Sequence, residues 1–150
     1  MENIRDLMAA DHRQCDDFFA AVERSLARAA WSDADAGFGR LQDAMWRHFD
    51  AEETILFPAF EARTGMSTGP TRVMRSEHDQ MRELLNAAKT ALEERNAEDY
   101  SGTAETLLIM MQQHNMKEEN ILYPMCDLQL AAQGETLLAQ LQSGISGAAK

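Results

Sequence analysis

The sequence predicts an all-α protein, an antiparallel up-down four-helix bundle with a short extra C-terminal helix. Three observations support this. Apolar residues recur at alternating steps of three and four through four long segments, as in helices packed side by side. Ten methionines stand against two tyrosines and two tryptophans, which favours a helical core over a sheet. The second half of the chain also repeats the first.

The ends of the segments can be placed from local signals. Ser32 with Asp35, and Asn96 with Asp99, are typical of helix N-caps followed by an acidic residue in the first turn. Proline is tolerated in a first turn, so Gly69-Pro70 marks the start of the third helix. We expect long helices near residues 4–30, 33–62, 70–95 and 98–123.

The C-terminal part is expected to complete the bundle and then fray. A shorter helix near residues 133–142 carries leucines that would cap one end of the bundle. Beyond it the chain is rich in glycine, serine and alanine. We therefore expect one domain over residues 1–143 and a flexible tail over residues 144–150.

Charge and composition exclude several classes of function. The formal net charge is −11, from 14 basic and 25 acidic residues, with no lysine or arginine cluster. Nucleic acids and anionic membrane surfaces are therefore not expected partners. Charged residues near the N-terminus and the lack of a long apolar run predict a cytoplasmic protein. The two cysteines, Cys15 and Cys126, form no CxxC motif and are expected to be thiols.

The internal repeat has a constant offset. His78 follows His12, and His114 follows His48, by the same 66 residues. The two stretches that begin at His48 and His114 share the pattern HxxxEExIL, followed by an aromatic residue and proline. A repeated helical hairpin predicts an approximate two-fold axis, and a site on that axis should draw residues from both halves.

Ligand-type side chains occupy the apolar seams of the predicted helices. The seams hold all four histidines of the chain and two glutamates: His12, His48, Glu52, His78, His114 and Glu118. A carboxylate in an apolar seam is costly unless it is paired or binds a metal, and no lysine or arginine occupies these seams. One histidine on a seam is usually a core residue, and one HxxxE pair is a weak signal. Their joint occurrence, in register across a repeat, predicts a metal site.

The ligand set indicates which metals the site would hold. Mixed imidazole and carboxylate ligands suit iron, manganese and zinc, and disfavour calcium. Six protein ligands are too many for one tetrahedral zinc ion. Two glutamates near the axis would instead bridge two ions, each with two histidines. The Glu-x-x-His motif of ferritin-like proteins is absent.

Several neighbours of these residues are candidates for the surroundings of the site. Cys15 and Met81 lie one turn beyond His12 and His78, where core packing by soft residues is the favoured interpretation. Glu77 precedes His78, as Asp11 precedes His12. One interpretation is that Glu77 and Asp11 reach the metal or hold a histidine. Exposure at the surface is the favoured interpretation.

The residues after each HxxxE pair are expected to be structural. Glu53 and Glu119 should be exposed or in salt bridges between helices, because they lie more than a right angle from the seam. Prolines 58 and 124 are expected to kink or end their helices. Phe57 and Tyr123 are expected to pack at the end of the bundle.

The ordered pattern of His12, His48/Glu52, His78 and His114/Glu118 resembles the hemerythrin family, in its bacterial HHE cation-binding branch. The resemblance covers roughly residues 4–127. It implies an oxo- or hydroxo-bridged pair of iron ions, with Glu52 and Glu118 as bridges. It also implies that His12 and His48 bind one ion and that His78 and His114 bind the other.

The sequence departs from the oxygen-carrying members of that family. Met74 stands where they have a fifth histidine, and their second motif is wider and ends in aspartate. We therefore expect a protein that binds or senses oxygen, or reacts with oxygen, nitric oxide or peroxide, without reversible oxygen carriage. A redox enzyme that scavenges peroxide or nitric oxide, an iron storage or delivery protein, and a structural zinc or manganese protein remain alternatives.

Overall fold

A computed structural model describes residues 2–147, and this part of the chain contains helices and no strand. The predicted all-α class is therefore confirmed. Two π-helical turns, η1 (Glu52–Leu56) and η2 (Glu118–Leu122), and a 3-10 turn, η3 (Ala131–Gln133), connect some of the helices. The α-helices are α1 (Ile4–Ala27), α2 (Trp31–Ala51), α3 (Phe57–Thr64), α4 (Pro70–Glu93), α5 (Ala97–Lys117), α6 (Tyr123–Gln129) and α7 (Gly134–Ser146).

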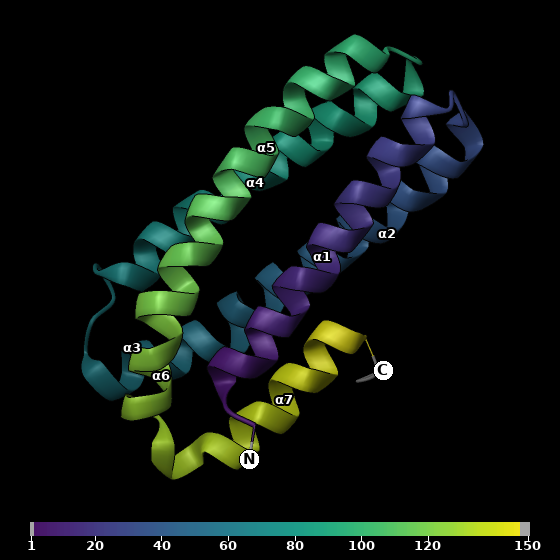
Figure 1. The fold of residues 1–150 in the computed structure, drawn as a ribbon. Coiled ribbons are helices and arrows are strands. Elements are labelled where there is room, and N and C mark those ends of the chain that lie inside the picture. The colour runs from purple at the N-terminus through teal and green to yellow at the C-terminus, as the bar shows by residue number, and fades with distance from the viewer. Residues whose placement is uncertain (1, 148–150) are drawn as a thin grey trace.

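The long helices form two hairpins that lie side by side (Figure 1). Helix α1 packs along α2 and α4 packs along α5, while α2 contacts α4 and α1 contacts α5 and α6. The two hairpin loops lie at the same end of the bundle. They contain Ala29 and Arg95, which have positive φ angles of 54° and 55° and are again 66 positions apart. The sequence repeat is therefore also a repeat of backbone conformation.

The prolines do not end their helices. Pro58 and Pro124 lie in the first turns of α3 and α6, where a missing N–H is tolerated. Each follows a π turn, in which the N–H of Phe57 donates to the carbonyl of Glu52 and the N–H of Tyr123 donates to that of Glu118. The helical path therefore continues to Thr64 and Gln129, beyond the predicted ends at 62 and 123.

One predicted cap is wrong and another is correct. Helix α2 begins at Trp31 after Ala30, without a side-chain cap, and Asp35 instead pairs with Arg95 at 2.8 Å. Asn96 caps α5 as predicted, because its Oδ1 accepts the N–H of Asp99 at 3.0 Å. The third long helix, α4, begins at Pro70 after Gly69, also as predicted.

The predicted C-terminal helix is present as α7, which packs against α1 and α2 and runs to Ser146. It thus extends past residue 143, where we expected the domain to end. Gly144 lies so close to α2 that a Cβ atom there would approach the Cβ of Ala51 to 3.2 Å. Of the predicted flexible tail, residues 148–150 lie outside the described residues.

The apolar core forms two clusters, and the histidines lie between them. One cluster, near the hairpin loops, includes Leu41, Leu85 and Leu107. The other includes Leu56 and Leu122. Along α1, α2 and α4 the histidine is flanked by members of both clusters, for example His12 by Met8 and Cys15. The imidazoles therefore sit in a polar layer inside an otherwise apolar interior.

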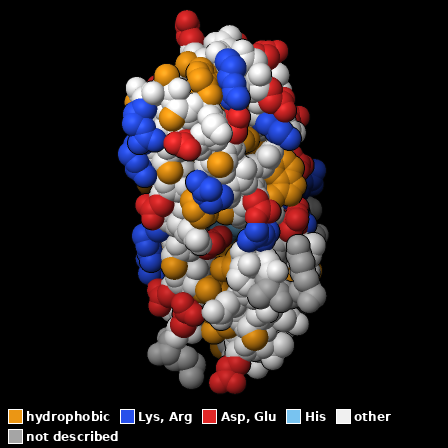
Figure 2. All heavy atoms as spheres, turned by 90° about the vertical axis from the view of Figure 1, so that its right-hand side faces the viewer, with side chains coloured by type: hydrophobic (Ala, Val, Ile, Leu, Met, Phe, Trp, Pro, Cys, Tyr) orange, Lys and Arg blue, Asp and Glu red, His pale blue; other side chains and the backbone are white. Residues whose placement is uncertain are grey.

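The surface is charged and mixed. Figure 2 shows acidic and basic side chains interspersed over one face, on which no histidine is visible. Within residues 2–147 no helix is long and apolar enough to cross a membrane.

The start of α1 is held by hydrogen bonds to its own cap residue and to α6. Asn3 accepts the N–H of Asp6 at 2.7 Å, and the carboxylate of Asp127 in α6 accepts the N–H groups of Ile4 and Arg5 at 2.8 and 3.2 Å. A carboxylate at a helix N-terminus satisfies orphan N–H groups and also interacts favourably with the helix dipole.

We predict that Asp127→Ala lowers the free energy of unfolding by about 1–2 kcal/mol, because two N–H groups lose their acceptor. Urea denaturation followed by circular dichroism measures the change. The control is Asp17→Ala, an exposed position on α1, with an expected change within about 0.5 kcal/mol. Equal changes in the two variants would show that Asp127 does not cap α1.

Candidate metal centre

The six residues predicted to share a site do lie together, and each has at most 4% of its surface exposed. Helices α1, α2, α4 and α5 each supply one histidine. The two glutamates are the first residues of η1 and η2. These residues are His12, His48, Glu52, His78, His114 and Glu118.

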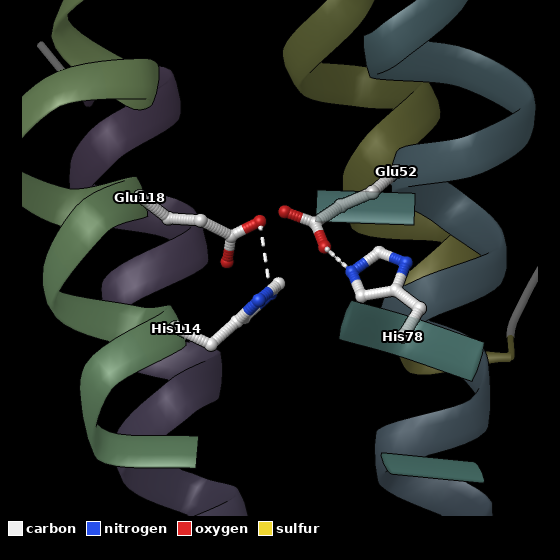
Figure 3. A group of neighbouring side chains, drawn as sticks. All are labelled: Glu52, His78, His114 and Glu118. Atoms are coloured by element: carbon white, nitrogen blue, oxygen red, sulfur yellow. Dashed lines mark ion pairs between the residues drawn. The ribbon is translucent and has the colours of Figure 1, made fainter. Parts of the chain in front are cut away.

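Four of them form one group. Glu52, His78, His114 and Glu118 each offer a ligand atom, and these atoms lie within 4.8 Å of one another. Figure 3 shows the two carboxyl groups pointing toward each other, with the two imidazoles beside them. His78 Nε2 lies 3.0 Å from Glu52 Oε1, and His114 Nε2 lies 3.4 Å from Glu118 Oε2.

None of these four atoms has a hydrogen-bond partner, although all are buried. Orphaned buried polar atoms are rare in folded proteins, and each one carries a desolvation cost. Four that converge on one point have the arrangement expected of ligands around a cation. The residues present therefore fit a bound metal ion.

A second group lies beside the first. His12, His48 and Glu118 also offer ligand atoms within 4.8 Å of one another. His12 Nε2 is 3.1 Å from both His48 Nε2 and Glu118 Oε1. Glu118 therefore contributes to both groups, with Oε2 in the first and Oε1 in the second. Glu52 Oε1 is 3.6 Å from His48 Nε2.

Every histidine in the centre is held by a carboxylate at its Nδ1 atom. The distances are between 2.6 and 2.8 Å. The pairs are His12 with Glu119, His48 with Asp11, His78 with Glu53, and His114 with Glu77. A carboxylate at Nδ1 fixes the orientation of the ring, so each Nε2 can offer its lone pair to a bound metal ion.

These four carboxylates contact the histidines, whereas the sequence favoured surface positions for some of them. Support of a histidine was one expectation for Glu77 and Asp11, and surface exposure was the favoured one. Each in fact holds a histidine of the same hairpin. Glu53 forms a salt bridge with Arg82 of α4, which was one of the two expectations for it. It also holds His78. The 66-residue repeat relates Asp11 to Glu77 and Glu53 to Glu119. That register was the signal that could have identified all four.

The family model of the hemerythrin HHE cation-binding domain matches residues 3–126. The chain belongs to the hemerythrin family. No curated protein and no solved structure matches the chain. The family binds metal cations, and the buried histidine and glutamate side chains fit that property.

This hemerythrin-family protein has one further site residue that sequence reasoning missed. The hydroxyl oxygen of Tyr123 lies 2.6 Å from Glu52 Oε2 and 2.8 Å from Glu118 Oε1. In a regular α-helix, residues five apart point about 140° away from each other. Within η2 the backbone of Tyr123 bonds to that of Glu118, which places both side chains on one face. The expectation that Tyr123 packs at the bundle end is therefore wrong.

The electrostatics of the centre favour cations. Burial alone would lower the pKa of a histidine, but the nearby carboxylates of Glu52 and Glu53 raise the pKa of His78 to about 9. Burial would raise the pKa of Glu53, but hydrogen bonds from His78 and Arg82 lower it to about 2. The carboxylates thus outweigh the cost of burying positive charge. The same surplus of negative charge attracts a metal ion.

The remaining candidates from sequence lie in two places. Cys15 and Met81 line a small cavity of about 20 Å³ beside His12 and His48, together with the sulfur-bearing residues Met45 and Met111. Met74 instead packs in the cluster that contains Leu56 and Leu122. Both cysteines are buried and free, and burial raises the pKa of each thiol.

We predict that Glu53→Ala weakens metal binding about 10- to 100-fold, because His78 loses the partner that orients its ring. Competition with a chelator of known affinity measures the change. Glu83→Ala, at an exposed position on α4, is the matched control. Unchanged affinity in Glu53→Ala would show that the hydrogen bond to His78 does not support the centre.

Proposed function

We propose that the chain holds two iron ions in a carboxylate-bridged, non-haem centre. His12 and His48 would bind one ion, and His78 and His114 the other. The observation that carries this proposal is the position of Glu118, whose two oxygens belong to different ligand groups. Glu52 would be the second bridge, since its Oε1 lies 3.0 Å from His78 and 3.6 Å from His48.

Iron is the metal that best matches the donor set and the proposed chemistry. Imidazole nitrogens and carboxylate oxygens together suit ions such as iron, manganese and zinc. Zinc or manganese would therefore occupy the same site when iron is scarce. Bound iron supplies the capacity to change oxidation state, while the surrounding residues hold the ions and exclude bulk water.

We further propose that the centre binds or reacts with a small molecule such as oxygen, nitric oxide or peroxide. The cavity beside His12 and His48 has a volume of about 20 Å³, enough for a molecule about the size of water. Besides the polar side chain of Asn115, the rest of the lining is apolar or sulfur-bearing and includes Cys15, Met81 and Phe49. A larger organic substrate would not fit, which favours a diatomic ligand or peroxide.

The position of Met74 bears on the fate of that ligand. Met74 is buried among apolar residues, and a thioether is a poor ligand for a hard ferrous or ferric ion, so Met74 would not replace a fifth histidine. We therefore favour sensing or reaction over reversible carriage. Scavenging of peroxide or nitric oxide is the second candidate, and steady-state consumption of either molecule with an added reductant would distinguish it from binding alone.

We predict about two iron ions per chain in protein produced with sufficient iron, measured by elemental analysis. Glu118→Ala should lose more iron than His12→Ala, because Glu118 serves both ions and His12 only one. Glu105→Ala, at an exposed position on α5, is the control and should retain both ions.

Folded wild-type protein with one ion or none would contradict the dinuclear proposal. A smaller loss in Glu118→Ala than in His12→Ala would show that Glu118 is not a bridge. Circular dichroism of each variant separates loss of metal from loss of fold.

A further inference from the structure

The repeat is broken at several positions around the centre, and one of them places a hydroxyl group against the carboxylates of the centre. Phe57 and Tyr123 are 66 residues apart and occupy equivalent places after the two π turns. The ring of Phe57 stacks on His78 and the ring of Tyr123 stacks on His12, each with centroids 5.7 Å apart. The two halves therefore differ at this point by one hydroxyl group, which reaches into the half formed by His12 and His48.

That hydroxyl faces more acceptors than it can satisfy. Besides Glu52 and Glu118, it lies 3.2 Å from His48 Nε2 and 3.3 Å from His12 Nε2. Asp11 and Glu119 hold the Nδ1 atoms of these two imidazoles, so each Nε2 is the ring atom that can offer a lone pair to an ion. One phenolic proton thus serves two carboxylates and two nitrogen lone pairs. The surplus of lone pairs in a fully buried space calls for a cation.

The distances around the hydroxyl are those between ligands of one ion. Four atoms are involved: His12 Nε2, His48 Nε2, Glu118 Oε1 and the Tyr123 oxygen. Five of the six distances among them lie between 2.8 and 3.3 Å. Neighbouring ligands with metal bonds of about 2.0–2.1 Å are about 2.8–3.4 Å apart. The tyrosine oxygen is therefore placed like a fourth ligand.

We propose that Tyr123 binds, through its phenolate oxygen, the metal ion held by His12 and His48. The proposal rests on the dinuclear centre described above and extends it. When the ion enters, the oxygen–hydrogen bond of the phenol breaks, an oxygen–metal bond forms, and the proton leaves to solvent. The oxidation state of the ion does not change in this step. Phe57 offers no such atom, so the two ions have unequal ligand sets.

The carboxylates that hold the histidines also differ between the two halves, in how directly lysine or arginine neutralises them. On the side of His78 and His114, Arg82 binds Glu53 at 2.9 and 3.0 Å, and Lys117 pairs with Glu77. On the side of Tyr123, no lysine or arginine of the described residues forms a salt bridge with the side chain of Asp11 or Glu119. His12 and, without a salt bridge to the side chain, Arg13 and Arg5 lower the pKa of Glu119, so negative charge in the half with the phenol is compensated less directly. In a mixed-valence pair, the ferric ion should occupy that half.

The chain offers a matched test, because Tyr123 and Tyr100 are its two tyrosines. Tyr100 is also buried, but it packs in the cluster near the hairpin loops. Wild-type, Tyr123→Phe and Tyr100→Phe proteins are loaded with ferric iron. Visible absorption and resonance Raman spectra then report any phenolate-to-iron charge transfer and tyrosinate ring modes. Elemental analysis gives the iron content of each sample.

We expect wild type and Tyr100→Phe to show the band and the ring modes, and Tyr123→Phe to lose both while keeping its helical fold. The band should persist after one-electron reduction of the diferric protein, because the remaining ferric ion should lie beside Tyr123. Loss of the band on this reduction would overturn that placement of the ferric ion. Wild-type protein with two ferric ions and no tyrosinate signal overturns the ligand role of Tyr123 and leaves the dinuclear centre intact. A tyrosinate signal that survives in Tyr123→Phe would also overturn the ligand role of Tyr123.

The ligand role is also tested without iron. Zinc loading should produce the ultraviolet difference spectrum of tyrosinate in wild type and in Tyr100→Phe, and no such spectrum in Tyr123→Phe. A chain that takes up zinc without this difference overturns the role of Tyr123. A chain that takes up neither metal overturns both this proposal and the proposed function.

Discussion

Two carboxylates lie against four imidazoles in the middle of an apolar bundle, and the cost of burying these groups constrains the rest of the structure. Glu52 and Glu118 are fully buried, and each has an oxygen without a hydrogen-bond partner. Such a layer is tolerable only if its charge is balanced. The protein supplies part of that balance at the periphery, where Arg82 and Lys117 neutralise carboxylates that hold His78 and His114. The centre of the layer has no such partner, and a metal ion would complete it.

Repetition of one hairpin provides most of this arrangement. Each copy supplies two histidines, one glutamate at the start of a π turn, and two carboxylates that hold histidines at Nδ1. A π turn adds one residue to the helical repeat, so that Glu118 and Tyr123 face the same way. Symmetry is lost where the copies differ in sequence, at Phe57 and Tyr123, and at Arg82, whose counterpart is Asp16. These differences make the two halves of the centre chemically distinct.

The sequence predicted the helices and the six inward-facing residues because both depend on periodicity and repetition. His48 and Glu52 share a face by simple i, i+4 geometry, so they could be assigned without knowing the packing. Tyr123 could not, because its direction depends on the π turn, which carries no clear sequence signal. Glu53 was placed only in part, since its bond to His78 depends on how α2 and α4 pack. The start of α2 at Trp31 was missed because it has no side-chain cap.

The central claim is that two ions share the space between His12, His48, His78 and His114, with Glu118 between them. Anomalous diffraction from crystals of the iron-loaded protein, recorded on both sides of the iron absorption edge, tests it most directly. We expect two iron peaks, one within about 2.0–2.3 Å of the Nε2 atoms of His12 and His48, the other equally close to those of His78 and His114. Both peaks should lie next to Glu118. A single peak, or peaks away from these histidines, would rule out a dinuclear centre at this place.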